Sequence, residues 1–204
     1  MKWGALVVSV LLVSGCVDGA AREGAAKEGG VFVDLEGKKV LMVIAPENFR
    51  DEEFMEPKEV FENAGAGVTV ASKGVDSAKG MMGAIVTVDS DISETDAGDY
   101  DAVVFVGGSG ASVYFNDKTA QNLARTAYEK GKIVAAICIA PSTLANAGLL
   151  EGKRATSFSS EKGNLEAKGA EYTGAAVEQD GRIITGNGPG AASEFGHKIA
   201  EALG

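Results

Sequence analysis

Short apolar runs separated by helix-like stretches fill the chain from residue 38 to its end. Runs of this length between polar residues are typical of strands buried on both faces of a sheet. The stretches between them carry apolar side chains at helical spacing and end at glycines. The predicted strands are residues 38–45, 68–71, 101–106, 132–137 and 154–158, and the predicted helices are residues 52–64, 117–130, 141–147, 161–168 and one that begins near Pro189.

Two further segments have the pattern of hairpins. Residues 75–92 place Ile85, Val86 and Val88 between polar residues, and residues 177–185 turn around an Asp-Gly pair. Pro57 falls in a predicted helix, and we expect it near the first turn, where proline is tolerated. Strands that alternate with helices predict a three-layer α/β sandwich with a mainly parallel sheet.

The first 37 residues have a different pattern, typical of an export signal and a linker. An apolar run at residues 5–13 follows Lys2, and it is too short to span a bilayer but matches a signal-peptide core. The run ends in Val-Ser-Gly-Cys16, which resembles a lipobox, so residues 1–16 predict a lipoprotein-type signal in which Cys16 is lipidated. A plain secretory signal is the alternative.

Residues 17–37 are rich in Gly, Ala and alternating charge, which predicts a flexible tether, and residues 38–204 form the expected domain. The expected location is the cell membrane, where the lipid would anchor the protein on the extracytoplasmic side. The alternative signal would make the protein secreted.

Composition excludes several classes of function. The formal net charge of −10 argues against nucleic-acid binding, which needs a basic surface to neutralise phosphates. Two cysteines and one histidine exclude a disulfide framework, a thiol-rich zinc site and any site with two imidazoles, so we expect neither a metal nor a cofactor. That histidine, His197, falls off the apolar face of the last predicted helix and is expected at the surface.

Candidate chemistry follows three of the predicted strands, because sites in parallel sheets form at the carboxyl ends of the strands. Arg50 and Glu53 follow the first strand, Gly107 and Gly108 follow the third, and Cys138 follows the fourth. If these strands are neighbours, a carboxylate, a glycine-rich amide cradle and a thiol converge on one crevice.

Cys138 lies where a buried strand turns directly into a helix, which is the setting of a nucleophile elbow. The helix N-terminus favours the thiolate, so the sequence predicts a lowered pKa for this thiol. A structural buried cysteine is the alternative interpretation.

Glu53 and the two glycines have both functional and structural interpretations. Glu53 could act as general acid and base, hydrogen-bond the thiol, or hold an oxygen of an oxidised cysteine, but it also suits the first turn of a helix. Gly107 and Gly108 could present amides to an oxyanion, or they could form an ordinary strand-to-helix turn.

Several motifs with matching order and spacing carry a resemblance to a known family. They are residues 40–45, 51–57, 103–108, 134–141, 146–150, 180–185 and 188–190. On these motifs, residues 38–204 resemble the ThiJ/PfpI superfamily, which includes the parkinsonism-associated deglycase and the PfpI-type intracellular peptidases. The resemblance implies a flavodoxin-like sandwich with a nucleophile elbow, similar to class I glutamine amidotransferases, and a homodimer or higher oligomer.

The resemblance also implies roles for individual residues. Cys138 would be the elbow nucleophile and Glu53 its acidic partner, while the amides of Gly108 and Ile139 would line the oxyanion pocket. Arg50 stands where several relatives carry a second acidic residue, and if it points inward it could favour anionic or carbonyl substrates.

The sequence departs from the family at its histidines. Ile139 stands where peptidase-like members carry a histidine after the nucleophile, and Ser157 stands where deglycase-like members carry another. The first hypothesis is therefore a glyoxalase or deglycase that acts on small reactive carbonyls or glycated proteins through Cys138 and Glu53. A redox-sensing or chaperone-like protein with an oxidisable Cys138 is the second, and a cysteine peptidase or amidase is disfavoured.

Overall fold

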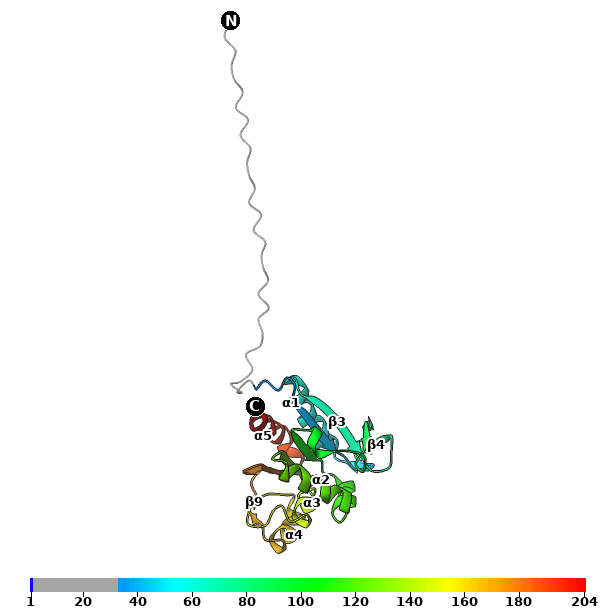
Figure 1. Ribbon diagram of the computed structural model, residues 1–204, viewed down its shortest axis with the longest axis vertical. Helices are drawn as coiled ribbons and strands as arrows, with labels where there is room; N and C mark the ends of the chain where they lie inside the picture. The colour runs from blue at the N-terminus through cyan, green and yellow to red at the C-terminus, as the bar shows by residue number, and fades with distance from the viewer. Residues whose placement is uncertain (2–32) are drawn as a thin grey trace. The chain divides into compact units, whose positions relative to one another are not determined.

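A seven-stranded sheet forms the centre of the computed structural model, which describes Met1 and residues 33–204 (Figure 1). Its strands run in the order β11-β12-β8-β7-β1-β3-β6, and all neighbours are parallel except β11 and β12. The strand bounds are β1 Lys39–Val43, β3 Gly67–Ser72, β6 Ser90–Asp91, β7 Ala102–Phe105, β8 Ile133–Ile137, β11 Val177–Asp180 and β12 Ile183–Gly186. This arrangement confirms the predicted, mainly parallel α/β sheet.

Five α-helices lie in the described residues. They are α1 Asp51–Asn63, α2 Lys118–Glu129, α3 Pro141–Asn146, α4 Lys162–Ala167 and α5 Ala192–Leu203, with 3₁₀ turns η1 Ala97–Asp99, η2 Ser109–Tyr114, η3 Ser159–Glu161 and η4 Pro189–Ala191. Of these helices, α1, α2, α3 and α5 pack against the central sheet. The β1-to-β3 and β7-to-β8 connections run in opposite directions across the sheet, so right-handed crossovers place α1 and α2 on opposite faces. The chain therefore forms a three-layer sandwich in which α5 packs beside α1 and α3 beside α2 (Figure 1).

The central strands are apolar because both of their faces are covered. Every residue of β7 and β8 is buried, as are four of the five residues of β1. A strand between two helical layers has no solvent side, so its sequence is a continuous apolar run instead of an alternating one. The apolar runs that predicted these strands are thus explained by the layers on either side.

Pro57 lies inside α1 and not near its first turn, which differs from the expectation. The helix continues through it because α1 is packed along its length on α5. A Cβ atom at Gly196 of α5 would lie 2.8 Å from Pro57 Cα, so only glycine allows the two backbones this close approach. Tertiary packing offsets the backbone hydrogen bond that proline cannot donate.

Two small sheets flank the main one. The first contains β2 Glu47–Phe49, β4 Ser77–Gly80 and β5 Ile85–Thr87, and its antiparallel β4–β5 pair confirms the hairpin predicted in residues 75–92. The second pairs β9 Arg154–Ala155 with β10 Glu171–Tyr172. The strand predicted at 154–158 is thus shorter than expected, because the next backbone amides bond elsewhere: Thr156 N donates to Thr185 Oγ1, and Phe158 N donates to Cys138 O.

Residues 33–37 are packed against the sandwich, which corrects the predicted C-terminal end of the tether. Leu35 is fully buried in the core, and its N–H donates to Ala64 O at 2.7 Å. The packed domain therefore begins before residue 38, the first residue that charge and composition predicted for it. The signal, Cys16 and the rest of the tether lie outside the described residues. Within the described part, no helix has the length and apolarity needed to cross a bilayer.

Candidate active site

The site forms at the carboxyl ends of three neighbouring strands. β7 pairs with β1 on one side and with β8 on the other, so the segments that follow these strands meet at one edge. After β1 the chain continues to β3 on one side of the sheet, and after β7 it continues to β8 on the other side. The boundary between β1 and β7 is therefore the topological switch point of the sheet. Open α/β sheets bind ligands at such points.

Cys138 occupies a strained backbone turn directly after β8. Its φ is 65°, which is rare for a residue with a side chain, and its backbone is held on both sides. Cys138 N donates to Gly186 O at 2.9 Å, and Cys138 O accepts from Phe158 N at 2.7 Å. Such strain is typical of functional sites, and the geometry is that of the predicted nucleophile elbow.

Glu53 lies in the first turn of α1 with its side chain fully buried. Phe49 and Phe54, which pack edge to face with centroids 5.6 Å apart, hold this end of the helix in the core. Neither carboxylate oxygen has a well-aligned hydrogen-bond partner within the described residues. Burial raises the pKa of Glu53 to about 7, although the nearby Cys138 thiol and the Arg50 charge lower it in part.

Gly107 packs against both Glu53 and Cys138. A Cβ atom at this position would collide with both Cys138 Cβ and Glu53 Oε2, so the glycine allows the two side chains to approach each other. Gly107 O also accepts from Arg50 N at 3.0 Å, which ties the glycine loop to the start of α1. The sequence predicted the convergence of these residues but not that Gly107 packs against both side chains.

Gly108 and Gly110 bring the same loop against the segment that follows β1. Gly108 has a φ of 92°, and a Cβ atom there would collide with the backbone of Asn48 to Arg50. A Cβ atom at Gly110 would collide with Glu47 O. These close approaches place the Gly108 amide near the thiol, where it and the amide of Ile139, the residue after the elbow, both stabilise the anionic form of Cys138.

The pKa of the Cys138 thiol is raised to about 12, which corrects the lowered value expected from the helix N-terminus. Burial is the largest cause, and the charge of Glu53 is the second. The amides of Gly108 and Ile139 lower the pKa, but they do not offset these two effects. The local sequence suggested only the favourable amides, whereas the opposing carboxylate comes from a distant part of the chain.

Arg50 borders the site and is paired with a neighbour on its own helix turn. Its Nε lies 2.8 Å from Glu52 Oε2, and its Nη2 donates to Glu52 Oε1 at 3.0 Å. The guanidinium is half-buried, and its charge lowers the pKa of Glu53. Arg50 therefore acts on the site electrostatically while Glu52 holds its side chain.

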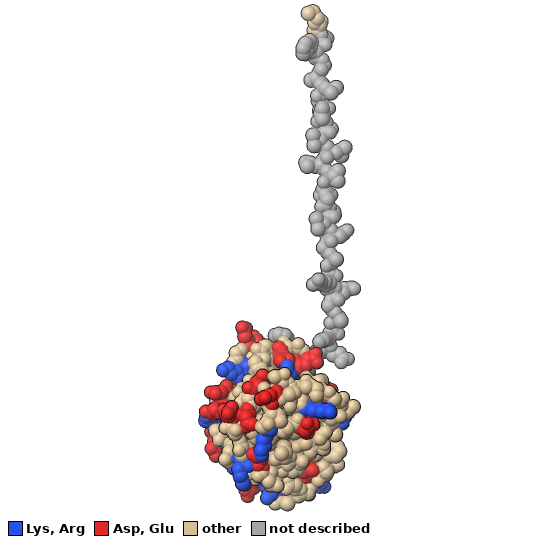
Figure 2. All heavy atoms as spheres, turned by 90° about the vertical axis from the view of Figure 1, so that its right-hand side faces the viewer, with Lys and Arg blue, Asp and Glu red and all other residues tan. Residues whose placement is uncertain are grey.

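No imidazole lies near Cys138, because the chain's one histidine, His197, is exposed on α5. Ser157 is buried, and its hydroxyl donates to Phe158 O at 3.0 Å. The described residues contain no cluster of three or more His, Cys, Asp or Glu side chains able to hold a metal ion. On the face shown in Figure 2, acidic and basic side chains are interspersed and form no broad basic surface.

A hollow of about 360 Å³ lies beside the elbow and was not foreseen from the sequence. It is lined by Ser157, Phe158, Ser159, Tyr172, Gly174, Asn187, Gly188, Pro189 and Gly190. Phe158, which directly precedes η3, is 47% exposed there, which is a large exposure for an aromatic side chain. No sequence signal marked these residues, because they come from three separate segments.

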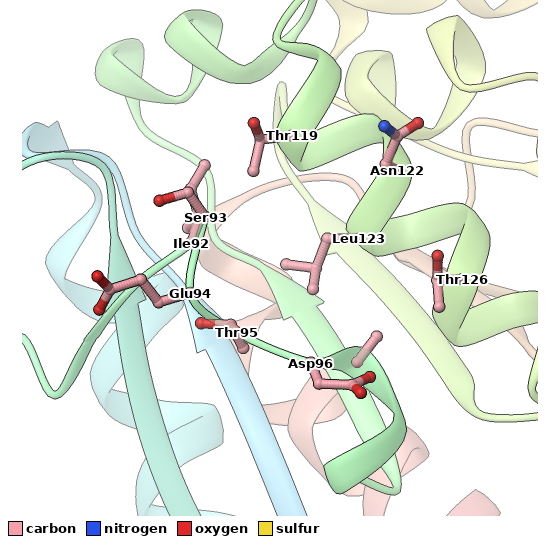
Figure 3. Close-up of a pocket in the computed structure, with 10 residues that line it drawn as sticks. Ile92, Ser93, Glu94, Thr95, Asp96, Thr119, Asn122, Leu123 and Thr126 are labelled. Atoms are coloured by element: carbon pink, nitrogen blue, oxygen red, sulfur yellow. The ribbon is translucent and has the colours of Figure 1, made fainter.

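A larger hollow of about 490 Å³ lies away from these residues, between α2 and residues 92–97 (Figure 3). Leu123 points into it from α2, where Thr119, Asn122 and Thr126 lie along the same side of the helix (Figure 3). None of the predicted site residues lines it. The larger of these two hollows therefore does not coincide with the site around Cys138.

Comparisons with known proteins cover most of the chain. The sequence model of the DJ-1/PfpI family matches residues 38–202. The uncharacterized protein MJ0967 of Methanocaldococcus jannaschii is 41% identical over 173 residues, which are 83% of this chain and 84% of that protein. Deglycase PH1704 of Pyrococcus horikoshii is 34% identical over 152 residues, which are 74% of this chain and 90% of that protein. The crystal structure of a ThiJ/PfpI domain protein from Brachyspira murdochii matches with a TM-score of 0.80 at 36% identity and covers 82% of this chain and 98% of its own.

Proposed function

The chain belongs to the DJ-1/PfpI family, and from this premise we propose that it is a cofactor-independent thiol enzyme of the glyoxalase or deglycase type. One observation carries the proposal: a fully buried Glu53 with a pKa of about 7 lies beside the elbow cysteine, and Gly107 packs against both. A carboxyl group with a pKa near neutrality can both accept and return a proton at physiological pH.

The first step is addition of the thiol to an aldehyde. The Cys138 Sγ forms a bond to the carbonyl carbon, and the thiol proton passes to Glu53. The carbonyl oxygen becomes an oxyanion, for which the amides of Gly108 and Ile139 are the proposed donors, because both act on the neighbouring Cys138 sulfur. Proton return from Glu53 to this oxygen gives a hemithioacetal, so the step needs no added acid or base.

The second step applies to a 2-oxoaldehyde substrate such as methylglyoxal. Glu53 removes the hydrogen on the carbon bonded to sulfur and returns it to the neighbouring carbon, which converts the adduct into a thioester of a 2-hydroxy acid. Water then cleaves the thioester, regenerates the thiol and releases the acid. The net reaction adds one water molecule and requires no external oxidant or reductant.

The test compares the full-length protein with Cys138→Ser and Glu53→Gln variants, using methylglyoxal consumption and lactate formation as readouts. We expect each variant to lose at least about 10³-fold in kcat/KM, because nucleophile and proton acceptor act as a unit. His197→Gln is the control and should retain wild-type turnover, since this side chain is exposed on α5. Equal turnover by wild type and Cys138→Ser would overturn the proposal.

Oxidation of Cys138 is a second candidate function. Cys138 is a partly exposed free thiol, and the amides of Gly108 and Ile139 lie near its sulfur, where they would stabilise the oxygens of an oxidised cysteine although they do not offset the raised pKa of the thiol. Peroxide treatment followed by intact-mass measurement should add oxygen at Cys138 and not in Cys138→Ser. An unchanged mass would remove this candidate. Peptidase or amidase chemistry is not proposed, because the site has no imidazole to serve as base.

We also propose a membrane location and a homo-oligomeric state. Lipidation at Cys16 would anchor the protein on the extracytoplasmic side, as the lipobox-like sequence suggests. Mass spectrometry of the membrane fraction tests this, and an unmodified N-terminus at or after Val17 would exclude it. Exposed apolar side chains on α1 and at the tip of the β4–β5 hairpin (Met55, Met81 and Met82) favour association of two copies, which light scattering can measure.

A further inference from the structure

The 360 Å³ hollow adjoins the elbow through its walls, while Cys138 itself is not one of its lining residues. Two of the segments that line it are hydrogen-bonded to the backbone of Cys138, one on each side of the residue. Phe158, in one wall, donates its N–H to Cys138 O, and Gly186, which precedes Asn187 in another wall, accepts from Cys138 N. A molecule bound in the hollow would thus lie beside the elbow.

The lining of this hollow is uncharged. None of its nine residues is acidic or basic, although 24% of the chain is charged. Its largest apolar surfaces are the rings of Phe158 and Tyr172, and nearly half of Phe158 is exposed. The Tyr172 ring also carries the Lys162 ammonium, which lies 5.6 Å from its centroid, so Phe158 is the ring that is free to meet a ligand. An exposed aromatic ring in an uncharged hollow is typical of a site for a neutral, partly apolar ligand.

Glycines keep the space beside both rings open. A Cβ atom at Gly174 would lie 3.5 Å from Tyr172 Cε1, and a Cβ atom at Gly188 would lie 3.6 Å from Phe158 Cδ2. The Tyr172 ring is fixed at its far end, because its hydroxyl donates to Ser157 O at 3.1 Å. The Tyr172 ring is therefore held in place, and the two glycines leave the space beside both rings free of side chains.

We propose that this hollow binds the non-reacting part of the substrate and that this part is a flat, neutral, aromatic group. The inference rests on the proposed function, since it assumes that the carbonyl carbon reacts with Cys138. A volume of about 360 Å³ lies at the lower end of small-molecule sites and exceeds what a three-carbon dicarbonyl fills. The substrate class is then carbonyl compounds with an aryl substituent, for which phenylglyoxal is the probe.

The test measures kcat/KM of the full-length protein for phenylglyoxal and for methylglyoxal. In Phe158→Ala, we expect the ratio of the two values to fall about 10-fold, the size of effect that apolar pocket contacts give. The value for methylglyoxal should stay within about 2-fold, because its methyl group is too small to reach the ring. Ile85→Ala is the matched control, since Ile85 is also a large exposed apolar residue but lies on the β4–β5 hairpin.

A second readout does not depend on turnover. Saturation-transfer NMR with benzyl alcohol, which cannot react with a thiol, should detect binding to wild type and to Ile85→Ala and its loss in Phe158→Ala. If no carbonyl is turned over but this pattern is found, the proposed function fails and the hollow stands as an aryl site. If methylglyoxal is turned over but Phe158→Ala changes neither the substrate ratio nor benzyl alcohol binding, the aryl site is overturned and the proposed function stands.

Discussion

Glu53 and Cys138, which both pack against Gly107, perturb each other's ionisation. The Glu53 charge raises the pKa of the Cys138 thiol, and contact with the thiol lowers the pKa of the Glu53 carboxyl. Burial raises both values, so two negative charges in this space are strongly disfavoured. Between pH 7 and 12 the pair holds one proton, which lies on the thiol while Glu53 is ionised, and in this state the carboxylate can accept that proton during thiol addition.

The first prediction concerns the pH dependence of turnover. Since the singly protonated pair is the reactive form, kcat/KM for methylglyoxal should rise as pH increases through about 7 and then stay level. Arg50→Gln should move this rise to higher pH, because the Arg50 charge lowers the pKa of Glu53. Glu53→Gln should abolish the rise near pH 7. A wild-type profile that is flat from pH 5 to 9 would contradict the assignment.

The second prediction concerns stability. The pKa of Glu53 rises from 4.5 to about 7 on folding, so below pH 4.5 the carboxyl is protonated in both states and costs nothing. Between pH 4.5 and about 7 the carboxyl ionises only in the unfolded state. The free energy of unfolding therefore falls by about 3 kcal/mol as pH rises through this range. Urea denaturation should therefore show Glu53→Gln to be more stable than wild type at pH 8 and equal to it near pH 4. Equal stability of the two proteins at pH 8 would show that burial of this carboxyl is not costly.

The third prediction concerns the contact between the glycine loop and β2. Gly110→Ala places a Cβ atom against Glu47 O, so we expect a loss of about 3 kcal/mol in the free energy of unfolding. Gly163→Ala is the matched control, because Gly163 lies in α4 with nothing within 4 Å of its Cβ position. Alanine there should be neutral or stabilise the helix by about 0.5–1 kcal/mol. Similar urea midpoints for the two variants would contradict the close approach.

The fourth prediction concerns Asp51, which joins the start of α1 to the β4–β5 hairpin. Its buried carboxylate accepts from Met82 N at 2.8 Å and from Ala84 N at 2.9 Å. Asp51→Ala should lower the free energy of unfolding by about 2–3 kcal/mol, since it leaves two amides without their acceptor. Hydrogen exchange of the Met82 and Ala84 amides should accelerate at least about 10-fold. Asp96→Ala, which removes a more exposed carboxylate that accepts from Gly98 N, should leave these two amides unchanged.

Much of the fold could be predicted from the sequence because its main signals are local. Strands β1, β7 and β8 are apolar runs, and their helices carry periodic apolar residues and end at turns, so each element is marked within its own segment. The exceptions depend on distant contacts. Leu35 is buried against the end of α1, and Pro57 is tolerated because α5 packs against it.

The candidate site also combines features marked in local sequence with features that depend on distant contacts. The sequence by itself determined which residues could do chemistry, since Cys138, Glu53 and the glycine pair each follow a buried strand. Only the tertiary structure decided how they act together. It placed Gly107 against both the carboxylate and the thiol, reversed the expected direction of the Cys138 pKa shift, and formed an uncharged hollow from three separate segments. The physical reason is that burial and electrostatic coupling depend on neighbours in space, and a strand-end motif contains no information about those neighbours.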